Sequence, residues 1–334
     1  MKSHELFIVD VFAEGKYRGN QLGVVRDAGD IPEDTLLEIA RELHFSETAF
    51  ILSETPRKTG SGTGLDSARS TGLDSARSTG LDSVWPVRIF TPEREVPFAG
   101  HPTLGTAFVI REFVLPDIPG TGAAESSGHG GPGSPEACPS LILSEPAGLI
   151  PVSFDSTGVA WMRQLPPRFG KVFTPEEAAP TVGLEPADID RSLPIREVST
   201  GLPFIILPLA GIDAVRRARL HRDSFFRLTA DTEAKDILLF SRQAEGKEND
   251  LHIRVFTEFE GIPEDPATGS AAGCLCGYLV EHDAYGSPEI DLRGEQGYEI
   301  NRPSLLRLKG RRTDTGISVM VGGRVFTVVR GTLL

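Results

Sequence analysis

The chain has 334 residues, enough for two domains of ordinary size, and its apolar fraction of 39% can supply a core for each. Its 34 basic and 47 acidic residues give a formal net charge of -13, which argues against nucleic acid or an anionic membrane surface as the main partner. A small anionic substrate stays compatible with this charge, because such a ligand needs only a local site.

The cysteines and the N-terminus indicate the compartment. Cys138, Cys274 and Cys276 form neither an even disulfide set nor a paired metal-binding pattern, which is typical of a reducing environment. The first residues lack the pattern of a secretory signal, and no apolar stretch approaches membrane-spanning length. The sequence therefore predicts a cytoplasmic protein.

The N-terminal part alternates between strand and helix character. The predicted elements are a strand at 6–12, a strand at 21–25, a helix from 32 to about 44 and a strand at 48–52. Pro32 suits the first turn of the helix. Ser46 and Glu47 consequently lie at a helix-to-strand junction, a position that often lines a cleft.

Two low-complexity segments interrupt the chain. Residues 63–83 read TGLDSARS twice and then TGLDS, and one leucine per unit is too little for stacked repeats. The sequence therefore predicts a disordered insert at 61–83. A Gly/Ser/Pro-rich linker is predicted at 118–138, between an N-terminal half at 1–117 and a C-terminal half at 139–334 whose last strand can cross back to the first half.

The C-terminal half is also predicted to alternate between strands and helices, as the N-terminal half does. Its predicted elements are strands at 141–143, 160–164 and 204–209, a helix at 210–220, and strands at 237–241 and 251–256. One short sequence motif occurs in both halves. The first copy is VRIFT at 87–91 with FAGHPTLGTA at 98–107, and the second is IRVFT at 253–257 with PEDPATGSA at 263–271. When the two copies are aligned, His101 occupies the position that corresponds to Asp265. The two halves therefore carry different ionisable groups at equivalent positions.

Each copy leads into an apolar helix, predicted at 103–113 and 267–282 and expected to be buried inside a sheet. Small residues in the first turns allow a ligand to approach the backbone amides closely. Because a helix N-terminus carries unpaired amides and partial positive charge, two such ends would hold a carboxylate. The small residues are Gly100, Gly105, Gly269, Ser270 and Ala271.

Glu47, His101 and Asp265 make up the predicted proton-transfer set. Glu47 lies between two phenylalanines, and apolar surroundings would raise its pKa toward working pH, while His101 and Asp265 orient the substrate or relay protons. This chemistry requires no cofactor. No HExxH motif or close pairing of ligand residues occurs, so no metal site is predicted.

Each of these residues also has an ordinary structural interpretation. Glu47 could brace a strand end at the surface, and His101 could be a hydrogen-bonded structural histidine. Asp265 followed by Pro266 is a common helix start, since aspartate caps helices and proline suits the first turn.

Several longer motifs extend the pattern over the whole chain. They are DVF at 10–12 with GN at 19–20, FSETAF at 45–50, RIFTP at 88–92, PFAGHPTLGTA at 97–107, STGLPF at 199–204, EDPATGSAAG at 264–273, QG at 296–297, RPS at 302–304 and VGG at 321–323. With these motifs the chain closely resembles the PhzF-like (phenazine-biosynthesis) family, within the diaminopimelate-epimerase-like fold. The resemblance leaves out only the two low-complexity segments.

The resemblance implies an α+β fold of two pseudo-symmetric domains, each a curved sheet or open barrel wrapped around a central helix, with the active site between them and a homodimer as the assembly. It implies a cofactor-independent isomerase of a small carboxylate-bearing substrate, in which Glu47 moves a proton and His101 and Asp265 assist. The substrate-binding residues that it implies are Ser46, Gly100, Gly269 and Ser270.

Two departures and two alternatives remain. The related epimerases carry cysteines at the positions of His101 and Asp265, so a two-thiol mechanism is not available to this chain. Gln21 stands where the family often has proline. An epimerase or lyase of the same fold would use the same carboxylate and differ in its product, whereas a non-catalytic protein would keep the cleft only for ligand binding.

Overall fold

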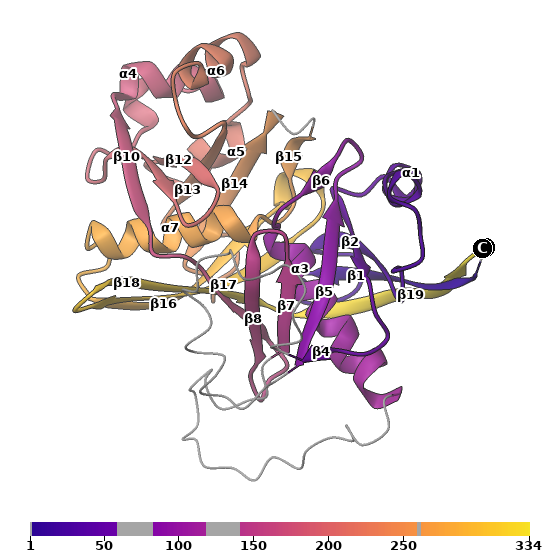
Figure 1. Ribbon diagram of the computed structural model, residues 1–334. Coiled ribbons are helices and arrows are strands. Elements are labelled where there is room, and N and C mark those ends of the chain that lie inside the picture. The colour runs from indigo at the N-terminus through magenta and orange to yellow at the C-terminus, as the bar shows by residue number, and fades with distance from the viewer. Residues whose placement is uncertain (1, 59–82, 118–140, 259–261) are drawn as a thin grey trace. The chain divides into compact units, whose positions relative to one another are not determined.

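The structure is a computed structural model that describes residues 2–58, 83–117, 141–258 and 262–334 (Figure 1). The predicted insert at 61–83 lies outside these residues except for Ser83, and the predicted linker at 118–138 lies outside them completely. Within the described part, no helix is both long and apolar enough to cross a membrane.

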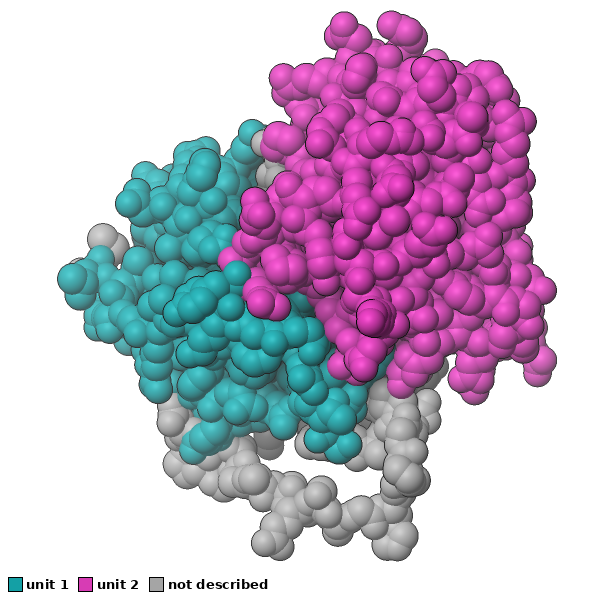
Figure 2. All heavy atoms as spheres, turned by 180° about the vertical axis from the view of Figure 1, so that it is seen from behind, with its two compact units in different colours: residues 1–17, 21–162, 323–334 teal, residues 18–20, 163–322 magenta. Residues whose placement is uncertain are grey.

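The chain divides into two compact units, shown in teal and magenta in Figure 2. Unit 1 contains residues 1–17, 21–162 and 323–334, and unit 2 contains residues 18–20 and 163–322. Each unit combines strands of a mixed sheet with a few helices, which gives a mixed α+β architecture.

Unit 1 is a sheet that surrounds one buried helix, α3. The elements are β1 (His4–Val11), β2 (Asn20–Val25), α1 (Glu33–Leu43), β3 (Glu47–Ile51), β4 (Arg57–Lys58), β5 (Ser83–Phe90), β6 (Glu95–Val96), α3 (Gly100–Val109), a π-helical turn (Ile110–Val114), a 3-10 turn (Leu115–Asp117), β7 (Leu141–Glu145), β8 (Gly148–Phe154), β9 (Ala160–Arg163) and β19 (Val325–Leu333). The strands pair in the order β19, β1, β2, β3, β5, β7, β8, β9, and β6 forms a short hairpin on β5. The pairs β2–β3 and β5–β7 are parallel.

In unit 2, α7 packs against strands of that unit. Its elements are β10 (Arg168–Phe173), α4 (Pro175–Ala178), 3-10 turns (Ala179–Val182 and Pro186–Asp188), β11 (Ile195–Ser199), β12 (Pro203–Pro208), α5 (Ile212–Arg217), α6 (Arg222–Thr229), β13 (Asp236–Ser241), β14 (Leu251–Thr257), β15 (Ile262–Asp265), α7 (Gly269–Glu281), β16 (Glu289–Gln296), a 3-10 turn (Tyr298–Ile300), β17 (Ser304–Thr313) and β18 (Gly316–Gly323). The strand order is β10, β11, β12, β13, β14, β16, β17, β18, with β15 as a hairpin on β14. Here β12–β13 and β14–β16 are the parallel pairs.

The two predicted apolar helices are confirmed as buried. Every residue of α3 except Phe108 is buried, and so are the residues of α7 from Gly269 to Val280. Small residues make this packing possible: a Cβ at Gly105 of α3 would stand 2.5 Å from Leu22 Cδ2 and 2.9 Å from Val11 Cγ2. At Gly105, α3 therefore packs closely against β1 and β2.

Candidate functional site

Glu47 and His101 meet in unit 1. Glu47 is the first residue of β3, which pairs in parallel with β2 so that Leu22 is opposite Glu47. His101 is the second residue of α3, and this helix packs against β3. His101 Nε2 lies 3.6 Å from Glu47 Oε2, with the Glu47 side chain 19% exposed and that of His101 5% exposed. Residues far apart in the sequence thus place an imidazole and a carboxylate side by side.

The imidazole of His101 is uncharged at neutral pH. Burial lowers its pKa to about 3, against a hydrogen bond with the backbone of Gln21 that acts in the opposite direction. The contact with Glu47 therefore joins a carboxylate to a neutral ring. A neutral imidazole can accept a proton on one nitrogen and donate one from the other, which is what a proton relay requires. Gln21, noted in the sequence only as a departure, helps to fix this ring.

Asp265 lies in unit 2, at the end of β15. Its carboxylate accepts hydrogen bonds from Asn20 Nδ2 at 2.9 Å and from Thr268 Oγ1 at 2.5 Å. Burial raises the pKa of Asp265 to about 6, although these two hydrogen bonds oppose the shift, and the nearby charge of Glu264 adds to it. Asp265 is thus a buried acid that titrates close to neutrality.

The interpretation of Asp265 as a helix cap is wrong. The N-cap of α7 is Thr268, and no side chain among the described residues caps that helix. The chain makes a turn between Asp265 and the helix, so the carboxylate meets Asn20 and Thr268 instead of the first amides. Likewise, the N-cap of α3 is Ala99, with no side-chain cap in the part of the chain that the structure describes. Both helices begin at the glycines singled out in the sequence, Gly100 and Gly269.

The remaining predicted residues flank these groups. Ser46 precedes Glu47 and is half-buried, and Gly100 precedes His101 at the start of α3. In unit 2, Ser270 is the second residue of α7 and is buried. Ser46 and Gly100 accordingly belong with the Glu47–His101 pair, while Gly269 and Ser270 belong with Asp265.

Gln296, to which the sequence assigned no role, contacts the turn that carries Asp265. Its amide donates to Asp265 O at 2.8 Å and its carbonyl accepts from Thr268 N at 3.2 Å, so it clamps the turn before α7. The next residue, Gly297, has φ of 78°, and a Cβ there would lie 2.6 Å from Pro266 O. The QG pair at 296–297 was therefore a signal for this contact, since glycine alone fits that close approach.

A buried charge network stabilises the strand that carries Gln296. His252 on β14 contacts Glu295 Oε1 through Nδ1 at 2.7 Å and Glu299 Oε1 through Nε2 at 2.8 Å. Burial opposes the charge on His252, but the two carboxylates outweigh it and raise the pKa of His252 to about 9. Because His252 pairs with Glu295 and Ile253 with Gln296 across β14–β16, the network is adjacent to the Asp265 turn.

Each unit contains an arginine–glutamate pair joined by two hydrogen bonds, here called the brace. Arg254 Nε and Nη2 donate to the two carboxylate oxygens of Glu264 at 2.9 and 2.7 Å. Arg88 Nε and Nη2 do the same with Glu95 at 2.7 and 2.6 Å. Such two-pronged pairs fix geometry as well as charge. Each brace joins a strand to the short hairpin strand that precedes the buried helix, β15 in one unit and β6 in the other.

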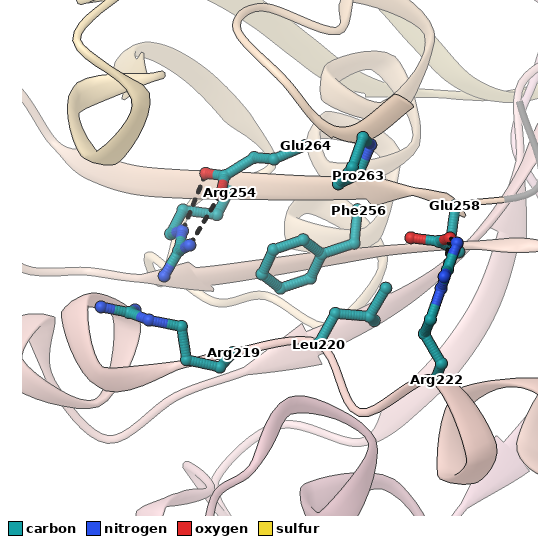
Figure 3. Close-up of a pocket in the computed structure, with 8 residues that line it drawn as sticks. All are labelled: Arg219, Leu220, Arg222, Arg254, Phe256, Glu258, Pro263 and Glu264. Atoms are coloured by element: carbon teal, nitrogen blue, oxygen red, sulfur yellow. Dashed lines mark hydrogen bonds and ion pairs between the residues drawn. The ribbon is translucent and has the colours of Figure 1, made fainter. Parts of the chain in front are cut away.

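Beside the unit 2 brace lies an open hollow of about 350 Å³ (Figure 3). Figure 3 shows Arg254 joined to Glu264, Arg222 beside Glu258, and Phe256 and Leu220 between the two pairs. The third arginine, Arg219, donates to the backbone oxygens of Arg216 and Ala218. The carboxylates of Glu264 and Glu258 neutralise Arg254 and Arg222, so of the described residues that line the hollow only Arg219 offers its charge to a ligand. Among the described residues, no cluster of His, Cys, Asp and Glu is arranged to hold a metal ion.

Comparison with known proteins gives a consistent result. Residues 9–331 match the family described as PhzC-PhzF, phenazine biosynthesis-like protein. The chain is 30% identical to the trans-2,3-dihydro-3-hydroxyanthranilate isomerase of Pseudomonas fluorescens, over 99% of each protein. It is 28% identical to an uncharacterized isomerase of Mesorhizobium japonicum, over 100% of this chain and 99% of the other. Its fold is similar to that of a PhzF-family phenazine biosynthesis protein from Bacillus anthracis, with a TM-score of 0.78, 26% identity and 100% coverage of both chains.

Proposed function

Because the chain belongs to the PhzC-PhzF family, whose named relatives are isomerases, we propose that it isomerises a small cyclic carboxylate by moving a proton between carbons. The observation that carries this proposal is the contact of Glu47 with a neutral His101 at the start of α3. A carboxylate beside a neutral imidazole has both a proton acceptor and a relay, which is sufficient for general acid/base catalysis without a cofactor.

In the proposed mechanism, Glu47 takes a proton from a ring carbon of the substrate and returns it at another position. His101 relays or orients this proton, and Asp265 acts as a further acid on the same substrate, with a pKa near 6 that suits exchange at neutral pH. The first turns at Gly100 and at Gly269 with Ser270, which no N-cap side chain caps in the described part of the chain, together with Ser46, bind the carboxylate of the substrate. Helix amides suit this role because they attract an anion without adding a formal charge.

The substrate named for the Pseudomonas relative, trans-2,3-dihydro-3-hydroxyanthranilate, is the first compound to test. The purified protein should convert it, or a related cyclic carboxylate from a panel, to a product of equal mass with a shifted double bond. A product of inverted stereochemistry would identify an epimerase, and a product of lower mass a lyase. Binding without turnover across the panel would favour a ligand-binding protein and contradict the proposal.

We also propose the pseudo-symmetry, the homodimer and the cytoplasmic location that the resemblance implies. The common strand order around α3 and α7, and the repeated arginine–glutamate brace, support a relationship between the units. We retain the halves 1–117 and 139–334 as a proposal for how the ancestral repeats divide. Light scattering tests the dimer directly, and a monomeric mass at micromolar concentration would contradict it.

Replacing Asp265 with asparagine is expected to reduce turnover without loss of stability at pH 7. Asp265 has a folded pKa raised from 3.8 to about 6, so its ionisation makes the folded state less stable as pH rises across that window. The neutral amide of the Asp265→Asn variant does not ionise. Thermal unfolding between pH 4 and 8 should therefore show the variant gaining stability relative to wild type as pH rises. A variant that loses stability relative to wild type over that range would contradict the assignment of Asp265 as a buried acid with a raised pKa.

A further inference from the structure

Glu145 is a buried carboxylic group that the proposed mechanism does not use. It is the last residue of β7, pairs with Gly148 of β8, and is 4% exposed. Its Oε1 lies 2.7 Å from Thr103 Oγ1 in the first turns of α3. Thr103 is fully buried and lies two positions after His101. Glu145 therefore contacts the same helix start that presents Gly100 and His101.

The hydroxyl of Thr103 faces two oxygen atoms, one of them in Glu145. Thr103 Oγ1 is also 2.8 Å from Ala99 O, the carbonyl oxygen of the N-cap residue. A hydroxyl has one proton, and a carbonyl oxygen can only accept. With Glu145 protonated, both contacts can be hydrogen bonds at once: the hydroxyl donates to Ala99 O and the carboxylic acid donates to the hydroxyl. A deprotonated Glu145 would leave Thr103 with two acceptors for one proton.

The surroundings of Glu145 also disfavour its ionised form. Its second oxygen, Oε2, is buried and has no hydrogen-bond partner among the described residues. The titratable groups on the elements packed against β7 are Arg88 on β5, which is paired with Glu95, and His101 on α3, which is uncharged; β8 contributes none. An isolated buried carboxylate is costly without a partner. In agreement, burial raises the pKa of Glu145 to about 8.

We propose that Glu145 is held as a neutral carboxylic acid that donates its proton to Thr103 Oγ1 and so fixes the first turn of α3. Thr103 in turn donates a hydrogen bond to Ala99 O. Separately, Ala147 N in the β7–β8 turn donates to Pro97 O at 2.9 Å. Glu145 is thereby a positioning residue for His101. This role rests on the proposed function of His101, but the protonation state of Glu145 does not.

The protonation state is tested by stability as a function of pH. The folded pKa of Glu145 is raised from 4.5 to about 8, so wild type loses stability as pH rises through that window. The Glu145→Gln variant keeps a donor for Thr103 and cannot ionise. Between pH 5 and 9 its Tm should fall less than that of wild type, by about 4 °C or more. Glu42→Gln, which removes an exposed carboxylate from α1, serves as the control and should follow wild type. Parallel curves for Glu145→Gln and wild type would overturn the proposal.

The positioning role is tested by activity once a substrate is known. Wild-type kcat should decline on the alkaline side with a midpoint near pH 8, and Glu145→Gln should keep its activity at pH 7 while losing that alkaline limb. Thr103→Ser, which retains the hydroxyl, should resemble wild type, whereas Thr103→Val should lower kcat by about tenfold or more at all pH values. A folded Glu145→Gln variant that is inactive at pH 7, or that keeps the alkaline limb, would overturn the role. If no substrate is turned over, the stability measurement still decides the protonation state.

Discussion

The Glu47→Gln variant is expected to fold as wild type does and to lose between about 10² and 10⁴-fold in kcat, the usual contribution of a positioned acid or base. Glutamine has the shape of glutamate but cannot take a proton from carbon at neutral pH. The side chain is largely buried, next to a neutral imidazole, so water cannot easily take over its role. Steady-state kinetics with the substrate of the wild-type enzyme measures the loss.

The matched control for Glu47→Gln is Glu38→Gln, which removes an exposed carboxylate from α1 in the same unit. It should leave kcat within about twofold and leave the thermal transition unchanged. A Glu47→Gln variant with kcat within tenfold of wild type would remove Glu47 from the mechanism. A variant with a lowered Tm would instead point to the structural role of a strand-end brace.

His252→Ala is expected to destabilise the protein by about 3–5 kcal/mol, because removing one partner of a buried ion network leaves the other charges uncompensated. Glu295 is fully buried and Glu299 nearly so, and both face the imidazole that would be lost. Glu295 also accepts from Asn249 Nδ2 at 2.6 Å and Gly246 N at 3.0 Å, so part of its hydrogen bonding would survive. Urea unfolding at pH 7 measures the change. His221→Ala, at an exposed histidine of unit 2, should cost no more than about 0.5 kcal/mol.

The pH dependence of the same network has a defined sign. The folded pKa of His252 is raised from 6.5 to about 9, so its contribution to stability is complete below 6.5 and is lost as pH rises through 9. For Glu295, burial would raise the pKa, but the hydrogen bonds from His252 and Asn249 lower it from 4.5 to about 2. That contribution is present above 4.5 and is lost as pH falls toward 2. A His252→Ala variant that costs less than about 1 kcal/mol, or that unfolds with the wild-type pH profile, would contradict this description.

Local patterns in the sequence predicted the parts of the site that depend on neighbouring residues. Gly100 and Gly269 begin α3 and α7, as the small residues indicated, because a helix start is fixed within a few positions. The duplicated motif also placed His101 and Asp265 near the starts of the two buried helices, and they lie at the second residue of α3 and at the end of β15. The helix-to-strand junction placed Glu47 at the start of β3, and its contact with His101 comes from the packing of α3 against β3.

The features of the site that the sequence did not predict depend on contacts between residues far apart in the chain. Asn20 and Asp265 are separated by 245 positions, and His252 and Glu295 by 43, so no periodicity or spacing connects them. Glu145 appears in the sequence as the polar end of an apolar strand, and only burial against Thr103 reveals its role. The helix-cap interpretation of Asp265 failed for a related reason: the residue type suits a cap, but the turn begins the helix at Gly269.

Solvent exchange tests the role of Glu47 most directly. Wild type and the Glu47→Gln variant are incubated with trans-2,3-dihydro-3-hydroxyanthranilate in D₂O, and the ring carbons are followed by proton NMR. Wild type is expected to form product with deuterium at a ring carbon, while Glu47→Gln returns the substrate unlabelled and unchanged. Deuterium incorporation by a folded Glu47→Gln variant at the wild-type rate would contradict the proposal that this carboxylate carries the proton.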